Sequence, residues 1–136
     1  MTRVYADMVA DLFHYGHVEF LRKARELGTY LIAGIVADDV AELSKKKPIL
    51  TMEERVTSVA GCKYVDQVLP NAPWRIDRAW ITLHHIQLVV HGDDYDQEQL
   101  DCIYNVPIKM GIFRAVPYTN SISTTEIIRR VLERSD

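Results

Sequence analysis

Short apolar runs alternate with amphipathic helical patterns along this 136-residue chain. The first run, Val4 to Ala6, is followed by apolar residues at helical spacing, and Gly28 is well placed to end that helix. Tyr30 to Ala37 is apolar on both faces, as expected of a strand buried inside a parallel sheet. Because strands that alternate with helices build parallel sheets, the sequence predicts an α/β fold: a doubly wound, five-stranded parallel sheet with helices on both faces.

The remaining elements continue this alternation. Polar residues from Asp38 to Lys47 predict a loop, and Thr51 with Glu54 predicts the capped start of a helix. Further strands are expected at residues 64–69, 86–91 and 111–116, and further helices at 75–83, 97–102 and from 123 to about 134. In such a sheet, ligands bind beyond the carboxyl ends of the strands, where the strand order reverses. The residues that follow predicted strands and therefore share one rim are His14, His17, Asp94 and Ser123.

Charge and cysteine content limit the class of protein. The formal net charge of -3 and the pI near 5.9 argue against a general nucleic-acid binder, which needs a strong basic excess. Cys62 and Cys102 lie forty positions apart without CxxC spacing, so no disulfide framework is implied. The longest apolar run is too short to cross a bilayer, and the N-terminus lacks a signal pattern. The sequence predicts a single cytoplasmic domain over residues 1–136, with neither nucleic acid nor a membrane as partner.

The segment His14-Tyr15-Gly16-His17 lies where the first strand gives way to the first helix. Two imidazoles three positions apart project to one side of a helical turn, and Gly16 lets the backbone approach a ligand. Far downstream, Ser123 and Glu126 have the spacing of a capping box, so the last helix begins with a positive dipole end that can hold phosphates. Together these features suggest a site for a nucleoside triphosphate.

Each feature also has a purely structural explanation. A histidine pair at this spacing is often a surface feature, and the charge pattern of Lys45 to Lys47 alone indicates a solvated loop. Ser123 would cap a helix without any phosphate, and Asp94 fits an ordinary turn. Trp74 would seal the core edge or a dimer contact as readily as it would contact a substrate. The order and context of the motifs therefore have to decide.

Several motifs, taken in order, resemble the cytidylyltransferase family over nearly the whole chain. They are residues 10–17, the lysine loop at 45–47, Glu54-Arg55, and residues 63–66, 71–74 and 122–125. The pattern is similar to that of choline-phosphate, ethanolamine-phosphate and glycerol-3-phosphate cytidylyltransferases. The resemblance implies a Rossmann-like nucleotidyltransferase fold. It also implies a reaction in which CTP and a phosphorylated alcohol give a CDP-alcohol and pyrophosphate, or in which a phosphonate gives a CMP-phosphonate. Mg2+ as counter-ion and a homodimer are further implications.

The resemblance also implies roles for particular residues. His14 and His17 would contact the phosphate chain, and Lys45 or Lys46 would bridge donor and acceptor, with the register between the two lysines left open. Asp94 would accept a hydrogen bond from the exocyclic amine of cytosine, which uracil lacks. Asp11 would orient the loop. The residues expected at the nucleotide are Val9, Ala10, Asp11, Gly16, Gly92, Asp94, Ser123, Thr124 and Thr125.

The acceptor is expected among a carboxylate and aromatic side chains. An aromatic cage beside a carboxylate suits an ammonium group through cation-π and Coulomb attraction. The residues expected to line this pocket are Asp7, Trp74, Tyr95 and Tyr118.

Two segments depart from the family pattern. Met8-Val9-Ala10 replaces a small glycine followed by a hydroxyl or thiol residue and an aromatic. Tyr118-Thr119-Asn120-Ser121 replaces Arg-Thr-Glu-Gly, so an expected phosphate-binding arginine is missing. Arg114 and Arg129 are the candidates to compensate.

These departures keep several functions open. Phosphoalcohols and phosphonates, such as hydroxyethyl- or aminoethylphosphonate, are about equally good acceptors on the sequence alone. An adenylyltransferase is a variant of the same enzyme class. The competing class is a non-catalytic nucleotide-sensing or assembly domain, because Met8, Ala10 and Tyr118 replace expected site residues. Such a domain would bind nucleotide without turnover.

Overall fold

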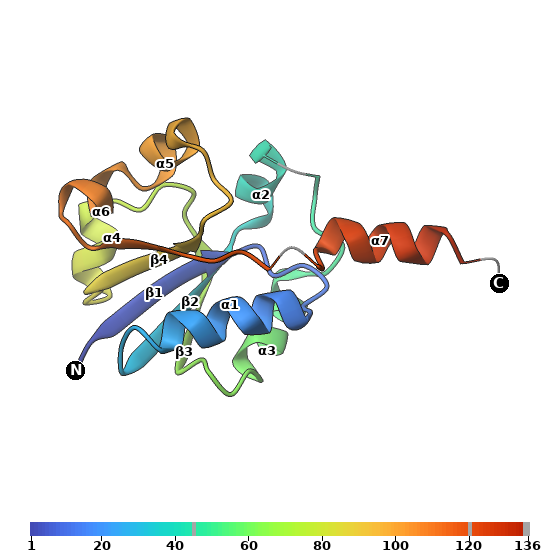
Figure 1. Cartoon of the computed structure of the whole chain (residues 1–136), viewed down its shortest axis with the longest axis horizontal. Helices are drawn as coiled ribbons and strands as arrows, with labels where there is room; N and C mark the ends of the chain where they lie inside the picture. Colours follow the sequence, from blue (N-terminus) through green and yellow to red (C-terminus); the bar gives the residue numbers. More distant parts are fainter. Residues whose placement is uncertain (45, 120, 135–136) are drawn as a thin grey trace.

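Five parallel strands form one sheet in the computed structural model, which describes residues 1–44, 46–119 and 121–134. The strand order is β3-β2-β1-β4-β5 (Figure 1). The strands are β1 (Arg3–Met8), β2 (Tyr30–Val36), β3 (Gln67–Ala72), β4 (Leu88–Gly92) and β5 (Phe113–Val116). Because the order reverses between β1 and β4, the sheet is doubly wound, and this confirms the predicted fold class.

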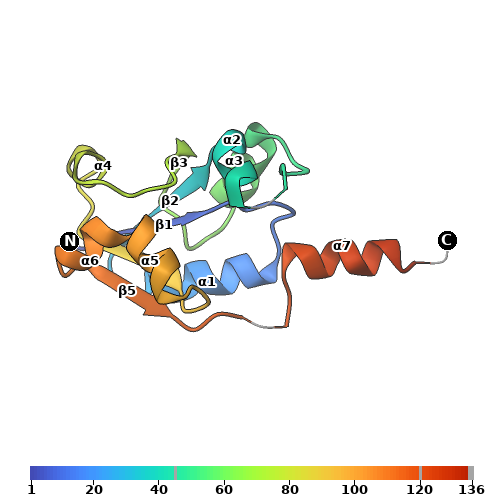
Figure 2. The same ribbon diagram turned by 90° about the horizontal axis from the view of Figure 1, so that it is seen from above.

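Helices cover both faces of the sheet. They are α1 (Tyr15–Arg25), α2 (Asp38–Ser44), α3 (Met52–Ala60), α4 (Arg78–Leu83), α5 (Gln97–Ile103), α6 (Asn105–Lys109) and α7 (Thr124–Leu132). In Figure 1, α1 and α3 lie below the strands and α5 and α6 lie above them. Figure 2 shows that α7 projects away from the body. Among the residues with a described structure, no helix has the length and apolar character needed to cross a membrane.

The central strand β1 divides the core into two clusters. Val4 and Ala6 pack with residues of α1 and α3, among them Leu21 and Val59. Tyr5 points to the opposite face and packs in the cluster of α4, α5 and α6. All three strand residues have no exposed surface, so β1 is buried on both sides. The strand therefore holds the site residues at its carboxyl end on a rigid support.

The stretch from Asp38 to Lys47, predicted as a loop, contains α2, so that prediction was wrong. Asp38 and Asp39 occupy the first turn, where carboxylates complement the positive end of the helix dipole. Ala41 is only 1% exposed and packs into the body. A short helix that buries one small side chain leaves little apolar periodicity in the sequence.

The third strand and the helix α6 also differ from the predictions. The third strand begins at Gln67 rather than at residue 64, because the backbone N–H of Val65 donates to the carbonyl of Cys62 and closes a turn. The helix α6 was not predicted. It is separated from α5 by Tyr104, whose backbone leaves the helical region.

Candidate active site

The turn between β1 and α1 has an unusual backbone. Ala10 and Leu12 have φ angles of 59° and 50°, in the left-handed region that residues with a side chain rarely adopt. Between them lies Asp11, whose carboxylate is buried and accepts hydrogen bonds from the backbone N–H groups of Ile49 (2.8 Å) and Leu50 (2.9 Å). Asp11 therefore anchors the segment that follows the lysine loop, as a residue that orients this loop would.

His14 and His17 cap the start of α1 reciprocally. The Nδ1 of His14 accepts a hydrogen bond from the backbone N–H of Gly16 (3.1 Å), and the Nδ1 of His17 accepts one from the backbone N–H of His14 (3.1 Å). The two ring centroids lie 3.9 Å apart, and the His17 ring stacks on Phe13. Because each Nδ1 is an acceptor, the proton of each neutral ring is assigned to Nε2.

This arrangement gives the site a neutral N–H donor at His14. Burial lowers the pKa of His14, which keeps its imidazole neutral at pH 7. An N–H fixed in position by a backbone cap can stabilise negative charge on a phosphate without reorganising. Gly16 lets the His14 ring and Ile122 lie close to the backbone, because an added Cβ would lie 2.8 Å from the His14 ring and 3.1 Å from Ile122.

The start of α7 lies against the same turn. The hydroxyl of Thr124 donates to the backbone carbonyl of Asp11 (2.7 Å), although the two residues are 113 positions apart. The hydroxyls of Tyr15 and Ser121 are also hydrogen-bonded to each other. The histidine pair and the hydroxyl-rich turn therefore share one rim of the sheet. Thr125, beside them, is exposed.

The capping box expected at α7 is only half formed. The Ser123 hydroxyl accepts a hydrogen bond from the backbone N–H of Glu126 (3.0 Å), but the Glu126 carboxylate pairs with Arg129 and Arg130 instead of returning to Ser123. These arginine hydrogen bonds lower the pKa of Glu126 to about 2. One carboxylate cannot easily serve both the helix start and two guanidinium groups.

The two candidate compensating arginines lie on different elements. Arg129 is held by Glu126 and by Glu133 along the exposed face of α7. Arg114 lies within β5, opposite Val90 and two residues before the strand ends. The compensation predicted for Arg114 or Arg129 stays a prediction.

Arg55 is a fully buried support behind the rim. Its guanidinium donates to the carbonyls of Val9 (2.9 Å) and Val36 (2.9 Å) and pairs with Asp38. These carbonyls lie at the carboxyl ends of β1 and β2. Arg55 therefore ties together the two strand ends that carry the site, and the Val9 carbonyl is committed to this bond.

The lysine loop is described only in part. Lys45 lies outside the described residues, whereas Lys46 is exposed and follows α2. Beyond Lys46, the chain is fixed by the bonds from Asp11 to Ile49 and Leu50. The loop thus starts from a helix and ends at an anchor on the β1–α1 turn.

The segment predicted to read the base lies at the end of β4. Asp94 is exposed, and its carboxylate lies 3.8 Å from the Nδ1 of His91. The backbone N–H of Tyr118 donates to the Asp93 carboxylate (2.9 Å), which fixes Tyr118 beside this segment. The Tyr118 ring lies near Gly92 rather than within the cluster around Asp7.

Asp7 lies within a cluster of aromatic side chains. Its carboxylate is 6% exposed and accepts a hydrogen bond from the Tyr104 hydroxyl (2.6 Å). The His91 ring stacks on Tyr95 at 4.1 Å and lies 5.4 Å from the Tyr104 ring. Trp74 packs against the same apolar cluster. Sequence reasoning missed His91 and Tyr104, because nothing in their spacing links either of them to Asp7.

The neighbours of Asp7 do not fully offset the cost of burying its negative charge. Burial raises the pKa of Asp7, and the opposing effects of His91 and of the Tyr104 hydrogen bond are smaller. Burial, together with the charges of Asp7 and Asp94, raises the pKa of Tyr95 to about 12. A cation placed beside Asp7 would relieve this cost, so the cluster favours a positively charged ligand group.

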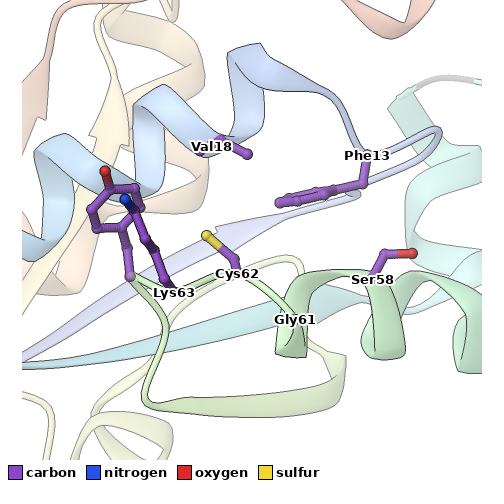
Figure 3. A pocket seen from close by; sticks show the side chains of 7 residues that line it. Phe13, Val18, Ser58, Gly61, Cys62 and Lys63 are labelled. Carbon is purple, nitrogen blue, oxygen red and sulfur yellow. The ribbon is translucent and has the colours of Figure 1, made fainter.

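A shallow cavity of about 540 Å³ lies between α1 and α3 (Figure 3). Phe13, Val18 and Cys62 make its lining largely apolar, and the ammonium of Lys63 lies 5.2 Å from the centre of the Tyr64 ring. Among the described residues, none that is predicted to contact the nucleotide lines this cavity.

Comparison with known proteins identifies the family. Residues 6–130 match the Cytidylyltransferase-like family. The chain belongs to this family. Its match with ethanolamine-phosphate cytidylyltransferase of Arabidopsis thaliana is 46% identical and covers 95% of this chain and 32% of that protein. Its match with choline-phosphate cytidylyltransferase A of Homo sapiens is 37% identical and covers 99% of this chain and 38% of that protein.

This cytidylyltransferase-like chain therefore spans about a third of the length of the curated relatives it matches. A solved structure, the lipopolysaccharide core biosynthesis protein from Thermoplasma volcanium GSS1, shares the fold with a TM-score of 0.69 and 26% identity. That match covers 88% of this chain and 99% of the other. The family suspected from the motifs is thus confirmed.

Proposed function

We propose that this chain transfers CMP from CTP to a small aminoalkyl phosphate or phosphonate, with release of pyrophosphate. Ethanolamine phosphate is the first acceptor to test, because an ethanolamine-phosphate cytidylyltransferase is 46% identical to this chain. The observation that supports an amino group most directly is the carboxylate of Asp7. It is buried among aromatic rings, and its pKa is raised.

The attacking group needs little help from the protein. The second pKa of a phosphomonoester is about 6, so its oxygen is already anionic at neutral pH. The bond that forms joins this oxygen to the α-phosphorus of CTP, and the bond that breaks releases pyrophosphate with its electron pair. The work of the enzyme is to hold two anions together and to stabilise the charge that builds up between them.

The residues of the β1–α1 turn would do this work. The Nε2–H groups of His14 and His17 donate to the phosphate chain, and the backbone cap of each ring fixes the direction of its proton. The start of α7, with Ser123 and Thr124, adds a positive dipole end for the outer phosphates. Lys45 or Lys46 is proposed to bridge donor and acceptor.

Magnesium is proposed to arrive with the nucleotide. Within the described residues there is no group of three or more His, Cys, Asp and Glu side chains that could hold a metal ion. The Asp11 carboxylate, three residues before His14, already accepts two backbone N–H groups. Mg2+ keeps several waters and often relies on substrate phosphates for ligands, so a Mg·CTP complex fits this site.

The ammonium of the acceptor would lie beside Asp7. One carboxylate oxygen accepts from Tyr104, so the other can take an N–H of a primary ammonium, with Tyr95 and His91 as aromatic neighbours. Ethanolamine phosphate and 2-aminoethylphosphonate share this group, whereas glycerol 3-phosphate and 2-hydroxyethylphosphonate lack it. The choice between phosphate ester and phosphonate is left to experiment.

The test is phosphorus NMR of the purified protein with CTP, Mg2+ and each acceptor in turn. The proposal expects pyrophosphate and a CMP adduct with the aminoalkyl acceptors, and much slower turnover with the hydroxyl analogues. Product from the hydroxyl analogues alone would contradict the role given to Asp7. CTP binding without product from any acceptor would favour the non-catalytic nucleotide-sensing domain.

Location and assembly are separate proposals. Cys62 and Cys102 are both free thiols, which suits a reducing compartment such as the cytoplasm. The homodimer implied by the family resemblance stays a prediction, to be tested by sedimentation of the protein in solution.

A further inference from the structure

Tyr118 follows β5 at the position where the family pattern has an arginine. Its backbone N–H donates to the Asp93 carboxylate (2.9 Å), so the residue is fixed to the segment after β4. Its side chain is 42% exposed at this end of the sheet. An exposed aromatic ring that is fastened through its own backbone offers a flat surface at little cost in entropy.

Gly92 lets the Asp94 carboxylate and the Tyr118 ring lie close to the backbone. A Cβ added to Gly92 would lie 2.8 Å from the Asp94 carboxylate oxygen and 3.7 Å from the Tyr118 ring. Gly92 is buried, and the absence of a side chain leaves room for the Asp94 carboxylate. An acceptor oxygen and an aromatic edge therefore converge over one bare α-carbon.

We propose that Tyr118 stacks on the base of the nucleotide while Asp94 reads the base edge. This inference rests on the proposed function and assigns to Tyr118 a task different from that of an arginine. Aromatic rings hold every base by stacking, whereas a carboxylate beside the ring distinguishes the amine of cytosine from the oxygen of uracil. Stacking supplies affinity and Asp94 supplies selectivity.

The position of Tyr118 supports the base over the other two ligand groups. The acceptor cluster is built from Asp7, His91, Tyr95 and Tyr104, and the hydrogen bonds and ring contacts that join those residues do not include Tyr118. A tyrosine also lacks the positive charge that makes arginine a phosphate ligand. The chain has thus exchanged a phosphate contact for an aromatic surface.

The test is calorimetric titration of Tyr118→Ala and Tyr118→Phe with CTP, UTP and inorganic triphosphate. Stacking predicts that Tyr118→Ala weakens CTP and UTP alike, by about 5- to 100-fold, and leaves the affinity for inorganic triphosphate within about 2-fold. Tyr118→Phe keeps the ring and should restore most of the CTP affinity. Asp94→Asn should reduce the preference for CTP over UTP.

Gly92→Ala is an independent probe of the same place. Its methyl group would displace the Asp94 carboxylate, so we expect weaker CTP binding and an unchanged affinity for inorganic triphosphate. Gly61→Ala is the matched control, because a Cβ there lies at ordinary distances of 3.5 and 3.8 Å from backbone carbonyl oxygens. The folding of all variants is checked by thermal melting.

Three results would overturn the inference. They are an equal loss of CTP and inorganic triphosphate in Tyr118→Ala, a change confined to the acceptor KM, and a wild-type protein that binds no nucleotide. The first would make Tyr118 a phosphate residue, and the second would return it to the acceptor pocket. A wild type that binds CTP but forms no product would contradict the proposed function alone, because the titrations do not depend on turnover.

Discussion

The two sides of the candidate site, the histidine turn and the cluster around Asp7, differ in how their polar groups are hydrogen-bonded. On the phosphate side, the polar groups of His14, His17, Asp11 and Thr124 are all hydrogen-bonded to backbone atoms. On the acceptor side, Asp7 has one hydroxyl partner in a largely apolar surrounding, and its pKa is raised by burial.

This difference reflects what each ligand brings. A triphosphate is highly charged and strongly hydrated, so its site must offer donors that are already oriented. A small ammonium carries a single positive charge. A buried carboxylate attracts a ligand that supplies this charge and offers no such attraction to a neutral ligand. In the proposed function, the phosphate side is thus preorganised, whereas the acceptor side holds an unfavourable charge that an aminoalkyl acceptor would neutralise.

The largest expected effect comes from the support that both sides share. Arg55→Met would leave the carbonyls of Val9 and Val36 buried without their donor. We expect a loss of about 3–5 kcal/mol in the free energy of unfolding, measured by urea denaturation. Lys63→Met, at an exposed position, is the control. A loss below about 1 kcal/mol would show that Arg55 does not hold the strand ends together.

A strong effect on catalysis is expected on the phosphate side. His17→Asn removes the Nε2–H donor and should lower kcat by about 100-fold or more, with little change in the acceptor KM. His85→Asn is the control, because His85 is exposed and asparagine tolerates its φ of 54°. If kcat stays within a few-fold of the wild type, the histidine pair is structural.

The acceptor side should respond in KM rather than in kcat. Asp7→Asn keeps an oxygen for the Tyr104 hydroxyl but removes the negative charge. We expect the KM of an aminoalkyl acceptor to rise by about 10- to 100-fold, and the Kd of CTP to stay within about 2-fold. A matched rise in the Kd of CTP would mean that the two sides are not separate.

The same variant should alter the pH dependence of stability. Because the pKa of Asp7 is raised above 3.8 in the folded state, its contribution is fully present below pH 3.8 and is lost as the pH rises through the folded pKa. Asp7→Asn should therefore be more stable than the wild type at pH 7, and this advantage should shrink toward pH 4. Thermal melts at both pH values measure it, and an advantage that is independent of pH would contradict the burial argument.

The smallest effect concerns the contact between the two ends of the chain. Thr124→Val removes the hydroxyl that donates to the Asp11 carbonyl, and should cost about 1 kcal/mol of stability. Thr125→Val changes the exposed neighbour and is the matched control. If both variants lose the same amount, the Thr124 bond contributes nothing specific.

Much of the architecture could be predicted from the sequence. The apolar run at residues 30–37 and the caps at Thr51 and Ser123 have local signatures, and all three lie within or beside the expected elements. The helix α2 was missed because Ala41 is its one residue classed as buried among those described, while Leu43 is exposed, so no apolar face stands out in the sequence. Local patterns identify an element only when its buried face is large.

The site was only partly predictable for a related reason. His14 and His17 could be found because their spacing and neighbours form a motif. His91 and Tyr104 could not, because the former lies at the end of β4, the latter follows α5, and only the folded sheet brings them to Asp7. The function of Arg55 as a link between Val9 and Val36 likewise depends on strand order, which the sequence does not state.

The central claim is that an anionic oxygen of an aminoalkyl acceptor attacks the α-phosphorus of CTP at this rim. The most direct test is phosphorus NMR of wild type, His17→Asn and Asp7→Asn with CTP, Mg2+ and ethanolamine phosphate. The account predicts pyrophosphate and a CMP adduct from the wild type, almost none from His17→Asn, and product from Asp7→Asn only at high acceptor concentration. Equal rates of product formation from all three proteins would contradict it.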